Sequence, residues 1–243
     1  MKILIIGPSW VGDMVMSQSL YTSLKKMHPS ASIDVLAPTW CRPILERMPE
    51  IDNAIEMPIG HGAFDLAGRW KLGRQLAKEK YTHAYILPNS AKSTLIPLFA
   101  GISHRIGWKG EMRYGLLNDL RPDKRVFQYM VERYVALSHK KSSMTHEVSI
   151  DKCPKPSLQV CVDSQQAARR KLHLTSNKPV VGLCPGAEFG PAKRWPDHYY
   201  AELAKYLINK GQQVWLFGSA KDKQVTEKIK SALTQEQQQY CFN

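Results

Sequence analysis

Short apolar runs that alternate with longer stretches of helical spacing constrain the fold of this chain more than any other feature. The first run covers residues 2–6 and ends at Gly7, and apolar residues at helical spacing follow as far as residue 28. Further short runs cover residues 33–37, 54–57 and 84–87, each followed by a helical stretch or a loop leading to one. Strands alternating with helices of ten or more residues are typical of βαβ units around a parallel sheet. The first half is therefore predicted to be a doubly wound α/β domain.

The middle of the chain interrupts this alternation. Residues 102–125 are rich in basic residues among glycines and aromatics, residues 127–137 favour a helix, and residues 138–157 are polar with two prolines, which is typical of a linker. The alternation then resumes, with strands expected at 180–183 and 213–217 and helices at 165–172, 196–209 and 222–233. We therefore expect two Rossmann-like domains, 1–155 and 156–243.

The second domain offers only two clear strand candidates, whereas one mononucleotide-binding half already takes three. A further strand is expected to begin within residues 239–243, where the sequence stops. We therefore expect an N-terminal part of a longer protein, or a second domain of reduced size.

The charge of the chain points to anionic partners. Its 34 Lys and Arg against 21 Asp and Glu give a net charge of +13, which suits nucleic acid, anionic lipid or a phosphorylated substrate. The first apolar run is too short for an export signal, and no run is long enough to cross a membrane. Five scattered cysteines without CxxC spacing suit reduced thiols. We expect a cytoplasmic protein.

A glycine-flanked loop, Gly7-Pro-Ser-Trp-Val-Gly-Asp13, joins the first strand to the first helix. Ligands of open α/β sheets bind at such strand ends. The loop is not GxGxxG, and Asp13-Met14 stands where a P-loop needs Lys-Ser/Thr. Asp13 is either an N-cap or first-turn acid, favoured by the helix dipole, or a general base at the mouth of a cleft.

A second loop, residues 184–196 (CPGAEFGPAKRWP), also runs from a strand to a helix. Free backbone N–H groups at a helix start attract anions, and Lys193 and Arg194 add full charges. The loop is therefore interpreted as a diphosphate site, with a solvated basic surface as the alternative. Residues 88–93 and 105–113 are basic segments that suit phosphates, carboxylates and sugar faces, or else a solvated surface.

The absence of several sequence motifs disfavours whole classes of protein function. The sequence has no Asp-x-Asp pair, no HExxH, no GxSxG and no zinc-finger or RNP-like motif. These absences disfavour a metal-dependent diphosphate clamp, a metalloprotease, an α/β-hydrolase and a nucleic-acid reader. We expect no metal and no cofactor.

Four segments together resemble glycosyltransferase family 9, the ADP-heptose:lipopolysaccharide heptosyltransferases. They are residues 7–13, 87–93 (LPNSAKS), 100–119 (AGISHRIGWKGEMRYGLLND) and 184–196. The resemblance implies a GT-B fold, with the acceptor held mainly by the first domain and the donor by the second. It also implies inverting, metal-independent transfer of L-glycero-D-manno-heptose from ADP-heptose, a substrate rather than a cofactor. The implied acceptor is the first heptose of the lipopolysaccharide inner core, attached through Kdo to lipid A.

The resemblance implies roles for the residues of this chain that stand at the family's functional positions. By resemblance, Asp13 is the base that takes the acceptor proton, and Lys193 binds the diphosphate. The other implied donor contacts are Gly186, Arg194 and Asp222, the last standing where the family often has Glu on the nucleotide ribose. The implied acceptor contacts are Ser9, Gly12, Lys92, Arg105, Lys109 and Arg113. The basic residues would suit Kdo carboxylates and phosphates at an anionic inner-membrane face.

The family continues with an Asp-Ser-Gly segment that helps hold the diphosphate, and nothing in these 243 residues corresponds to it. We therefore expect this chain alone to bind ADP poorly and to turn over little. Two rival functions stay open: transfer of the first or third heptose, and a non-catalytic basic α/β module that binds anionic lipid or nucleic acid.

Overall fold

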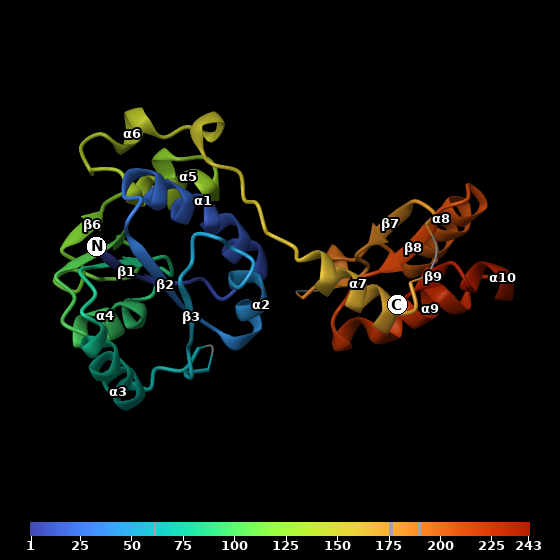
Figure 1. The fold of residues 1–243 in the computed structure, drawn as a ribbon, viewed down its shortest axis with the longest axis horizontal. Coiled ribbons are helices and arrows are strands. Elements are labelled where there is room, and N and C mark those ends of the chain that lie inside the picture. Colours follow the sequence, from blue (N-terminus) through green and yellow to red (C-terminus); the bar gives the residue numbers. More distant parts are fainter. Residues whose placement is uncertain (61, 175–176, 189–190) are drawn as a thin grey trace. The chain divides into compact units, whose positions relative to one another are not determined.

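The computed structural model describes residues 1–60, 62–174, 177–188 and 191–243. The chain divides into two compact units, Met1–Val160 and Cys161–Asn243 (Figure 1). The boundary predicted between residues 155 and 156 lies slightly earlier, and the roles predicted for the two domains stay predictions. Within the described residues, no helix is both long and apolar enough to cross a bilayer.

The first unit is built on one parallel sheet. Its strands are β1 (Lys2–Ile6), β2 (Ser32–Ala37), β3 (Asn53–Glu56), β4 (His83–Ile86), β5 (His104–Trp108) and β6 (Asp119–Arg121). Their order in the sheet is β3-β2-β1-β4-β5-β6, with every neighbouring pair parallel. This is the doubly wound order of a Rossmann-like domain, so the predicted fold class is confirmed for this unit.

Helices cover both faces of this sheet. They are α1 (Val11–Met27), α2 (Arg42–Leu45), α3 (Leu66–Leu76), α4 (Leu95–Phe99), α5 (Met130–Val135) and α6 (Met144–Glu147). Side chains of β1 alternate between two apolar clusters. Ile3 and Ile5 belong to the cluster with α1 and α5, while Leu4 and Ile6 belong to the cluster with α3 and α4. A strand buried on both faces explains the continuous apolar run at residues 3–6.

The segment 102–125, expected to interrupt the alternation of strands and helices, in fact contains the last two strands of the sheet. β6 is only three residues long, and Arg121 within it is 2% exposed. The Arg121 guanidinium donates to both carboxylate oxygens of Asp119, at 2.8 and 2.9 Å, and to the His139 carbonyl at 2.8 Å. A buried charge needs such partners, and they allow a polar strand that hydrophobic patterning does not reveal.

The polar segment 138–157, expected to be a linker, packs onto the first unit instead. Met144, Val148 and Cys153 are buried in the cluster that includes α1. Farther along, Ser19 Oγ on α1 donates to the Pro154 carbonyl at 2.6 Å, and the Ser157 N–H donates to the Gln18 side chain at 2.9 Å. The linker prediction was therefore wrong, because three spaced apolar residues anchor an otherwise polar stretch.

The second unit has a smaller parallel sheet in the order β7-β8-β9. Its elements are α7 (Val162–Lys171), β7 (Val180–Leu183), α8 (Asp197–Asn209), β8 (Gln213–Leu216), α9 (Lys223–Ser231), α10 (Gln235–Gln238) and β9 (Cys241–Phe242). β9 lies where a further strand was expected to begin. Residues of α8, β8 and α9 form the core, including Ala204, Val214 and Ile229, each fully buried.

Candidate functional site

The order of the first sheet reverses at β1, between β2 and β4, and the loop from β1 to α1 begins there at Gly7. The Gly7 N–H donates to the Leu36 carbonyl at 2.9 Å. A Cβ at residue 7 would lie 2.9 Å from Met14 Cε and 3.2 Å from Val35 Cγ1, so a larger residue would push against α1 and β2. Ligands of open α/β sheets bind at this reversal. The close turn therefore places the start of α1 at the binding edge of the sheet.

Asp13 is the third residue of α1, and its side chain is half-buried. Trp10 is the N-cap residue, so Asp13 is a first-turn acid rather than the cap. The positive end of the helix stabilises a carboxylate at this position. Tyr134 on α5 lies beside it: burial, and then the charge of Asp13, raise the pKa of the tyrosine hydroxyl. The carboxylate thus sits at the sheet reversal, where the predicted base is needed.

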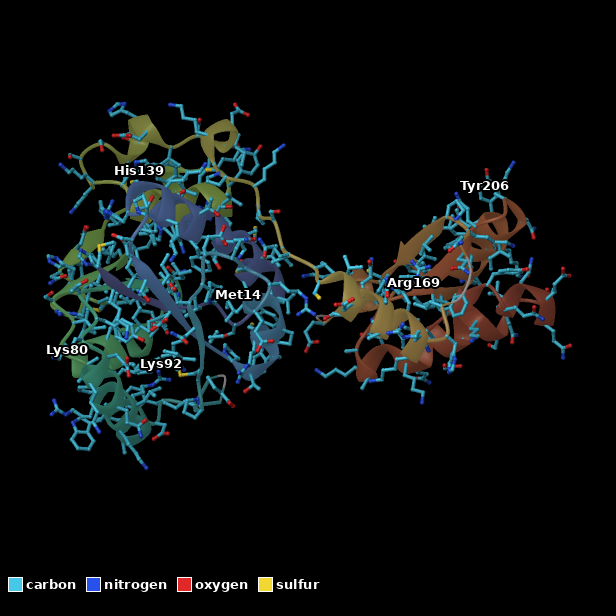
Figure 2. All side chains as sticks on the ribbon, viewed as in Figure 1. Met14, Lys80, Lys92, His139, Arg169 and Tyr206 are labelled. Atoms are coloured by element: carbon cyan, nitrogen blue, oxygen red, sulfur yellow. The ribbon has the colours of Figure 1, made fainter. Side chains whose placement is uncertain are left out.

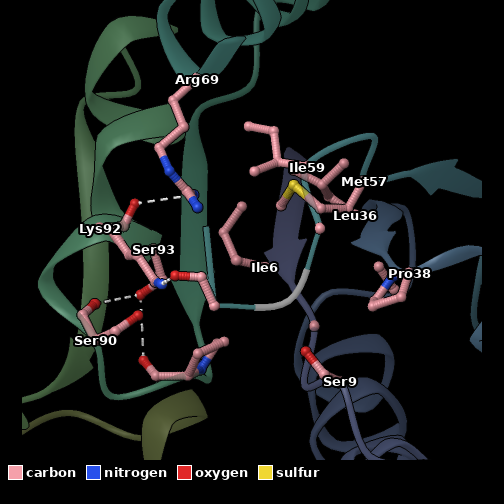
Figure 3. A pocket seen from close by; sticks show the side chains of 15 residues that line it. Ile6, Ser9, Leu36, Pro38, Met57, Ile59, Arg69, Ser90, Lys92 and Ser93 are labelled. Carbon is pink, nitrogen blue, oxygen red and sulfur yellow. Dashed lines mark hydrogen bonds between the residues drawn. The ribbon is translucent and has the colours of Figure 1, made fainter. Parts of the chain in front are cut away.

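A pocket of about 230 Å³ opens at this edge (Figure 3). Its lining includes two predicted acceptor residues, Ser9 and Lys92, together with apolar side chains from the ends of β1 and β2. The Ser9 carbonyl accepts from Trp40 Nε1 at 2.9 Å, which holds the loop after β1. Gly12 is exposed in the first turn of α1. The structure therefore gathers Ser9, Gly12 and Asp13 in one loop and its helix. Ser9 and Lys92 line the pocket, whereas Gly12 and Asp13 are not among its lining residues.

The pocket wall depends on Arg69 of α3, which was not predicted from the sequence. Arg69 is 5% exposed, and its guanidinium donates to the carbonyls of Phe64 at 2.6 Å, Ala63 at 3.0 Å and Lys92 at 3.2 Å. Lys92 Nζ donates to the Gly62 carbonyl at 2.5 Å. These bonds tie the loop before α3 to the loop after β4. No motif in the sequence distinguishes Arg69 from the other cations of its helix.

The predicted acceptor cations of the segment 105–113 divide into two kinds. Lys109 is exposed and lies over the Tyr114 ring, 5.4 Å from its centroid. Arg105 is half-buried and donates to the carbonyls of Leu116 and Ile102, at 2.7 and 2.6 Å. Lys109 therefore keeps its ammonium at the surface, while the Arg105 guanidinium already binds backbone.

Arg113 is fully buried. Its guanidinium donates to the carbonyls of Pro88, at 2.8 Å, of Lys109, at 3.3 Å, and of Trp108. Burial lowers the pKa of Arg113 to about 10, so the side chain stays charged at pH 7. The expectation that Arg113 contacts the acceptor is therefore corrected: its charge holds the loops after β4 and β5 together.

We expect Arg113→Ala to lower the free energy of unfolding of the first unit by about 3 kcal/mol, because three carbonyls lose a buried, charged donor. Urea unfolding followed by circular dichroism measures this change. Lys109→Ala, in the same loop but exposed, is the matched control and should change stability by less than about 0.5 kcal/mol. Equal stabilities of the two variants would contradict the assignment of Arg113 to the loop.

In the second unit, the loop from β7 to α8 carries the predicted donor residues. Lys193 ends a short 3₁₀ turn, and Lys193 and Arg194 are both exposed. Arg194 donates to the Ala187 carbonyl at 3.3 Å. Pro196 is the N-cap residue of α8, one position before the helix proper. Phe189 and Gly190 of the predicted loop lie outside the described residues.

Gly186 and Asp222 are in direct contact. A Cβ at residue 186 would lie 2.3 Å from the Asp222 carboxylate, so glycine is needed for this approach. Asp222 Oδ2 accepts from the Ser219 N–H and hydroxyl, both at 2.8 Å. These bonds, and then the charges of Arg194 and Lys221, lower the pKa of Asp222. The structure thus brings Gly186, Arg194 and Asp222 together at the carboxyl ends of β7 and β8.

A hollow of about 360 Å³ lies beside this group, between the starts of α8 and α9. Its lining contains Arg194 and two cations that were not predicted, Lys221 and Lys228, with Trp195 and Asp197. Lys221 Nζ also lies 2.8 Å from Glu188 Oε1. Three basic side chains at one hollow make this edge suitable for an anionic ligand. Among the described residues, no group of three or more His, Cys, Asp or Glu side chains could hold a metal ion.

Two Rossmann-like parallel α/β units, with candidate sites at the strand ends of each, are the architecture predicted from the sequence, that of the GT-B class of glycosyltransferases. The sequence model of glycosyltransferase family 9 (heptosyltransferase) matches residues 69–243. The chain belongs to this family, and the enzyme class predicted from the sequence is confirmed.

Individual relatives agree with the family. Lipopolysaccharide heptosyltransferase 2 of Escherichia coli (strain K12) is 56% identical over all of this chain and 70% of its own length. Lipooligosaccharide heptosyltransferase 2 of Haemophilus influenzae is 54% identical, over all of this chain and 71% of its own. The structure of E. coli ADP-heptose lps heptosyltransferase II has a TM-score of 0.90 and 55% identity, over 99% of this chain and 71% of that one.

Proposed function

We propose that this chain transfers L-glycero-D-manno-heptose from ADP-heptose to the first heptose of the lipopolysaccharide inner core. The observation that carries the proposal is the 56% identity, over the whole chain, with a lipopolysaccharide heptosyltransferase 2. The position of Asp13 at the sheet reversal supports it further, because the reaction needs a base where the acceptor binds.

In this reaction Asp13 takes the proton of the acceptor hydroxyl. The hydroxyl oxygen attacks the anomeric carbon of the donor from the face opposite the diphosphate. A new glycosidic C–O bond forms as the bond to the diphosphate breaks, and ADP leaves with the electron pair. The configuration at the anomeric carbon is inverted, and no metal or cofactor takes part.

The leaving diphosphate needs positive charge as it develops in the transition state. Lys193 and Arg194 are the donor-loop cations, and both are exposed in the loop from β7 to α8. Ser219 holds the Asp222 carboxylate and lowers its pKa, which supports Asp222 as the acceptor of hydrogen bonds from the ribose hydroxyls. We assign these three residues and Gly186 to the donor, with the second unit as the donor domain.

The acceptor carries Kdo carboxylates and lipid A phosphates, which match the net charge of +13. The pocket lined by Ser9 and Lys92 is our candidate for its sugar part. Since lipid A is embedded in the inner membrane, we place the enzyme at the cytoplasmic face as a peripheral protein, and we expect no nucleic acid as partner.

Release of ADP from ADP-heptose, measured with heptose-free, mono-heptosylated and di-heptosylated acceptors in parallel, tests the function. The protein is the chain extended by any residues that continue its reading frame. ADP release with mono-heptosylated Kdo₂-lipid A alone is the expected result. Release of ADP with the heptose-free acceptor would show that the enzyme transfers the first heptose. Release only with a di-heptosylated acceptor would show that it transfers the third.

Failure of the folded protein to release ADP with any of these acceptors would overturn the transferase proposal. Steeply salt-dependent binding to anionic lipid or nucleic acid without transfer would then favour the basic binding module.

A further inference from the structure

The outer face of α3 exposes large apolar side chains that the fold does not use. Phe64, Leu66 and Trp70 are 59%, 49% and 55% exposed. Leu66 and Trp70 are four residues apart and therefore lie on the same side of the helix. Phe64 stands two residues before the helix begins. We call these three residues, with the neighbouring cations Lys71, Arg74 and Lys78, the α3 patch.

The opposite face of α3 holds the helix firmly in place. Arg69, Leu72 and Leu76 are buried, and a Cβ at Gly73 would lie 2.5 Å from Phe99 Cβ of α4. Leu66 and Trp70 of the α3 patch are thus presented by a helix that packs against α4. Its exposed side chains contribute little to the core of the first unit.

Basic side chains outnumber acidic ones around the α3 patch. Lys71, Arg74 and Lys78 are exposed, and the helix itself contains no acidic residue. The two flanking acids are engaged: Asp65 accepts from the Gly68 N–H at 3.0 Å, and Glu79 pairs with Lys2 at 2.6 Å. An anionic bilayer surface binds apolar and aromatic side chains that lie beside a cluster of basic side chains.

The position of the patch fits a substrate that is attached to lipid. Arg69, on the same helix, lines the acceptor pocket and binds the Phe64 carbonyl. No patch residue lines the pocket itself, but the Phe64 carbonyl is bound by a side chain that does. A bilayer in contact with Phe64 would therefore lie one residue away from the pocket wall.

We propose that the α3 patch docks the first unit on an anionic phospholipid bilayer, with Leu66 and Trp70 at the level of the headgroups and Lys71 and Arg74 on the lipid phosphates. The proposal rests on the proposed function for the identity of the membrane-bound acceptor. The docking itself depends only on the chemistry of the patch, so it can be tested without donor or acceptor.

Sedimentation with vesicles of 30% phosphatidylglycerol and 70% phosphatidylethanolamine at about 0.1 M salt measures docking. We expect Lys71→Glu with Arg74→Glu, and separately Leu66→Ser with Trp70→Ser, to weaken vesicle binding more than tenfold. The charge-matched control is Arg170→Glu with Lys171→Glu on α7, where both side chains are exposed. The apolar control is Tyr206→Ser on α8 (Figure 2), where the ring is 60% exposed. Both controls should bind as the unchanged protein does.

Absence of vesicle binding by the unchanged protein, or equal binding by patch and control variants, would overturn the proposal. So would a concentration-dependent dimer lost in the Trp70 variant, which would assign the patch to a second copy, or patch-dependent binding to duplex DNA in place of vesicles. Turnover of a deacylated, water-dispersed acceptor should be unchanged in the patch variants. A failure of docking with intact turnover is therefore distinct from a failure of the proposed transferase function.

Discussion

Replacement of Asp13 by Asn should lower the rate of ADP release with the acceptor present by about 100- to 10,000-fold, the usual contribution of a general base. Asparagine keeps the size of the side chain but cannot take the acceptor proton. Affinity for ADP should change by less than about twofold, because the predicted donor residues lie in the second unit. Steady-state ADP release and calorimetric titration with ADP, on the chain extended as above, measure the two quantities.

A matched substitution separates chemistry from helix stability. Asp163 is also a first-turn acid, on α7. Both Asp→Asn changes remove a charge from a helix start, which costs about 0.3–1 kcal/mol of stability. Asp163→Asn should leave turnover unchanged. Turnover of Asp13→Asn close to that of the unchanged enzyme would remove Asp13 as the base and leave it a helix-stabilising acid.

The second large effect is expected at Lys193. Lys193→Ala should weaken ADP binding about tenfold, since a charge-assisted hydrogen bond contributes roughly 1.5–3 kcal/mol. It should also lower turnover by about 100-fold or more, because charge on the leaving diphosphate increases in the transition state. Titration with ADP and single-turnover release measure the two effects on one preparation.

Lys210, exposed just after the far end of α8, provides the control for that experiment. Lys210→Ala removes the same charge near the opposite end of α8 and should alter neither binding nor turnover. If Lys193→Ala changed only the melting temperature, the loop 184–196 would be a solvated basic surface, the alternative that the sequence left open.

The central strands could be predicted because their sequences are nearly unbroken apolar runs. β1, β2 and β4 are almost fully buried, and their residues Ile3, Val35 and Ile86 are each inaccessible to solvent. Such runs indicate a parallel sheet that is covered by helices on both faces. The loops that follow them could be located for the same reason, since each begins where an apolar run ends.

Three of the features that were not predicted share a physical cause: a buried arginine whose hydrogen-bond partners come from elsewhere in the chain. Arg121 in β6, Arg113 and Arg69 are all buried with carbonyl or carboxylate partners contributed by distant segments. Hydrophobic patterning treats each as a surface residue. The same limit applies to the site, where an exposed Lys109 and a buried Arg113 look alike in the sequence.

Asp13 and Lys193 could be singled out because each lies in a distinctive loop that resembles the family. The position of a residue in a loop at a strand end reduces the number of candidate site residues. It does not distinguish a general base from an acid that stabilises the helix. That distinction depends on the acceptor hydroxyl, which no pattern in this chain describes.

The central place of β1 has a consequence for how the protein is made. Ile3 pairs on one side with Ile33 and on the other with His83, 80 residues further along the chain. At a synthesis rate of about 5–20 residues per second, β4 follows β1 by roughly 4 to 16 seconds. During that interval the most apolar strand of the nascent chain has an open edge. The first unit therefore passes through a period in which it is vulnerable to aggregation, and a ribosome-associated chaperone would protect it most before residue 83 emerges.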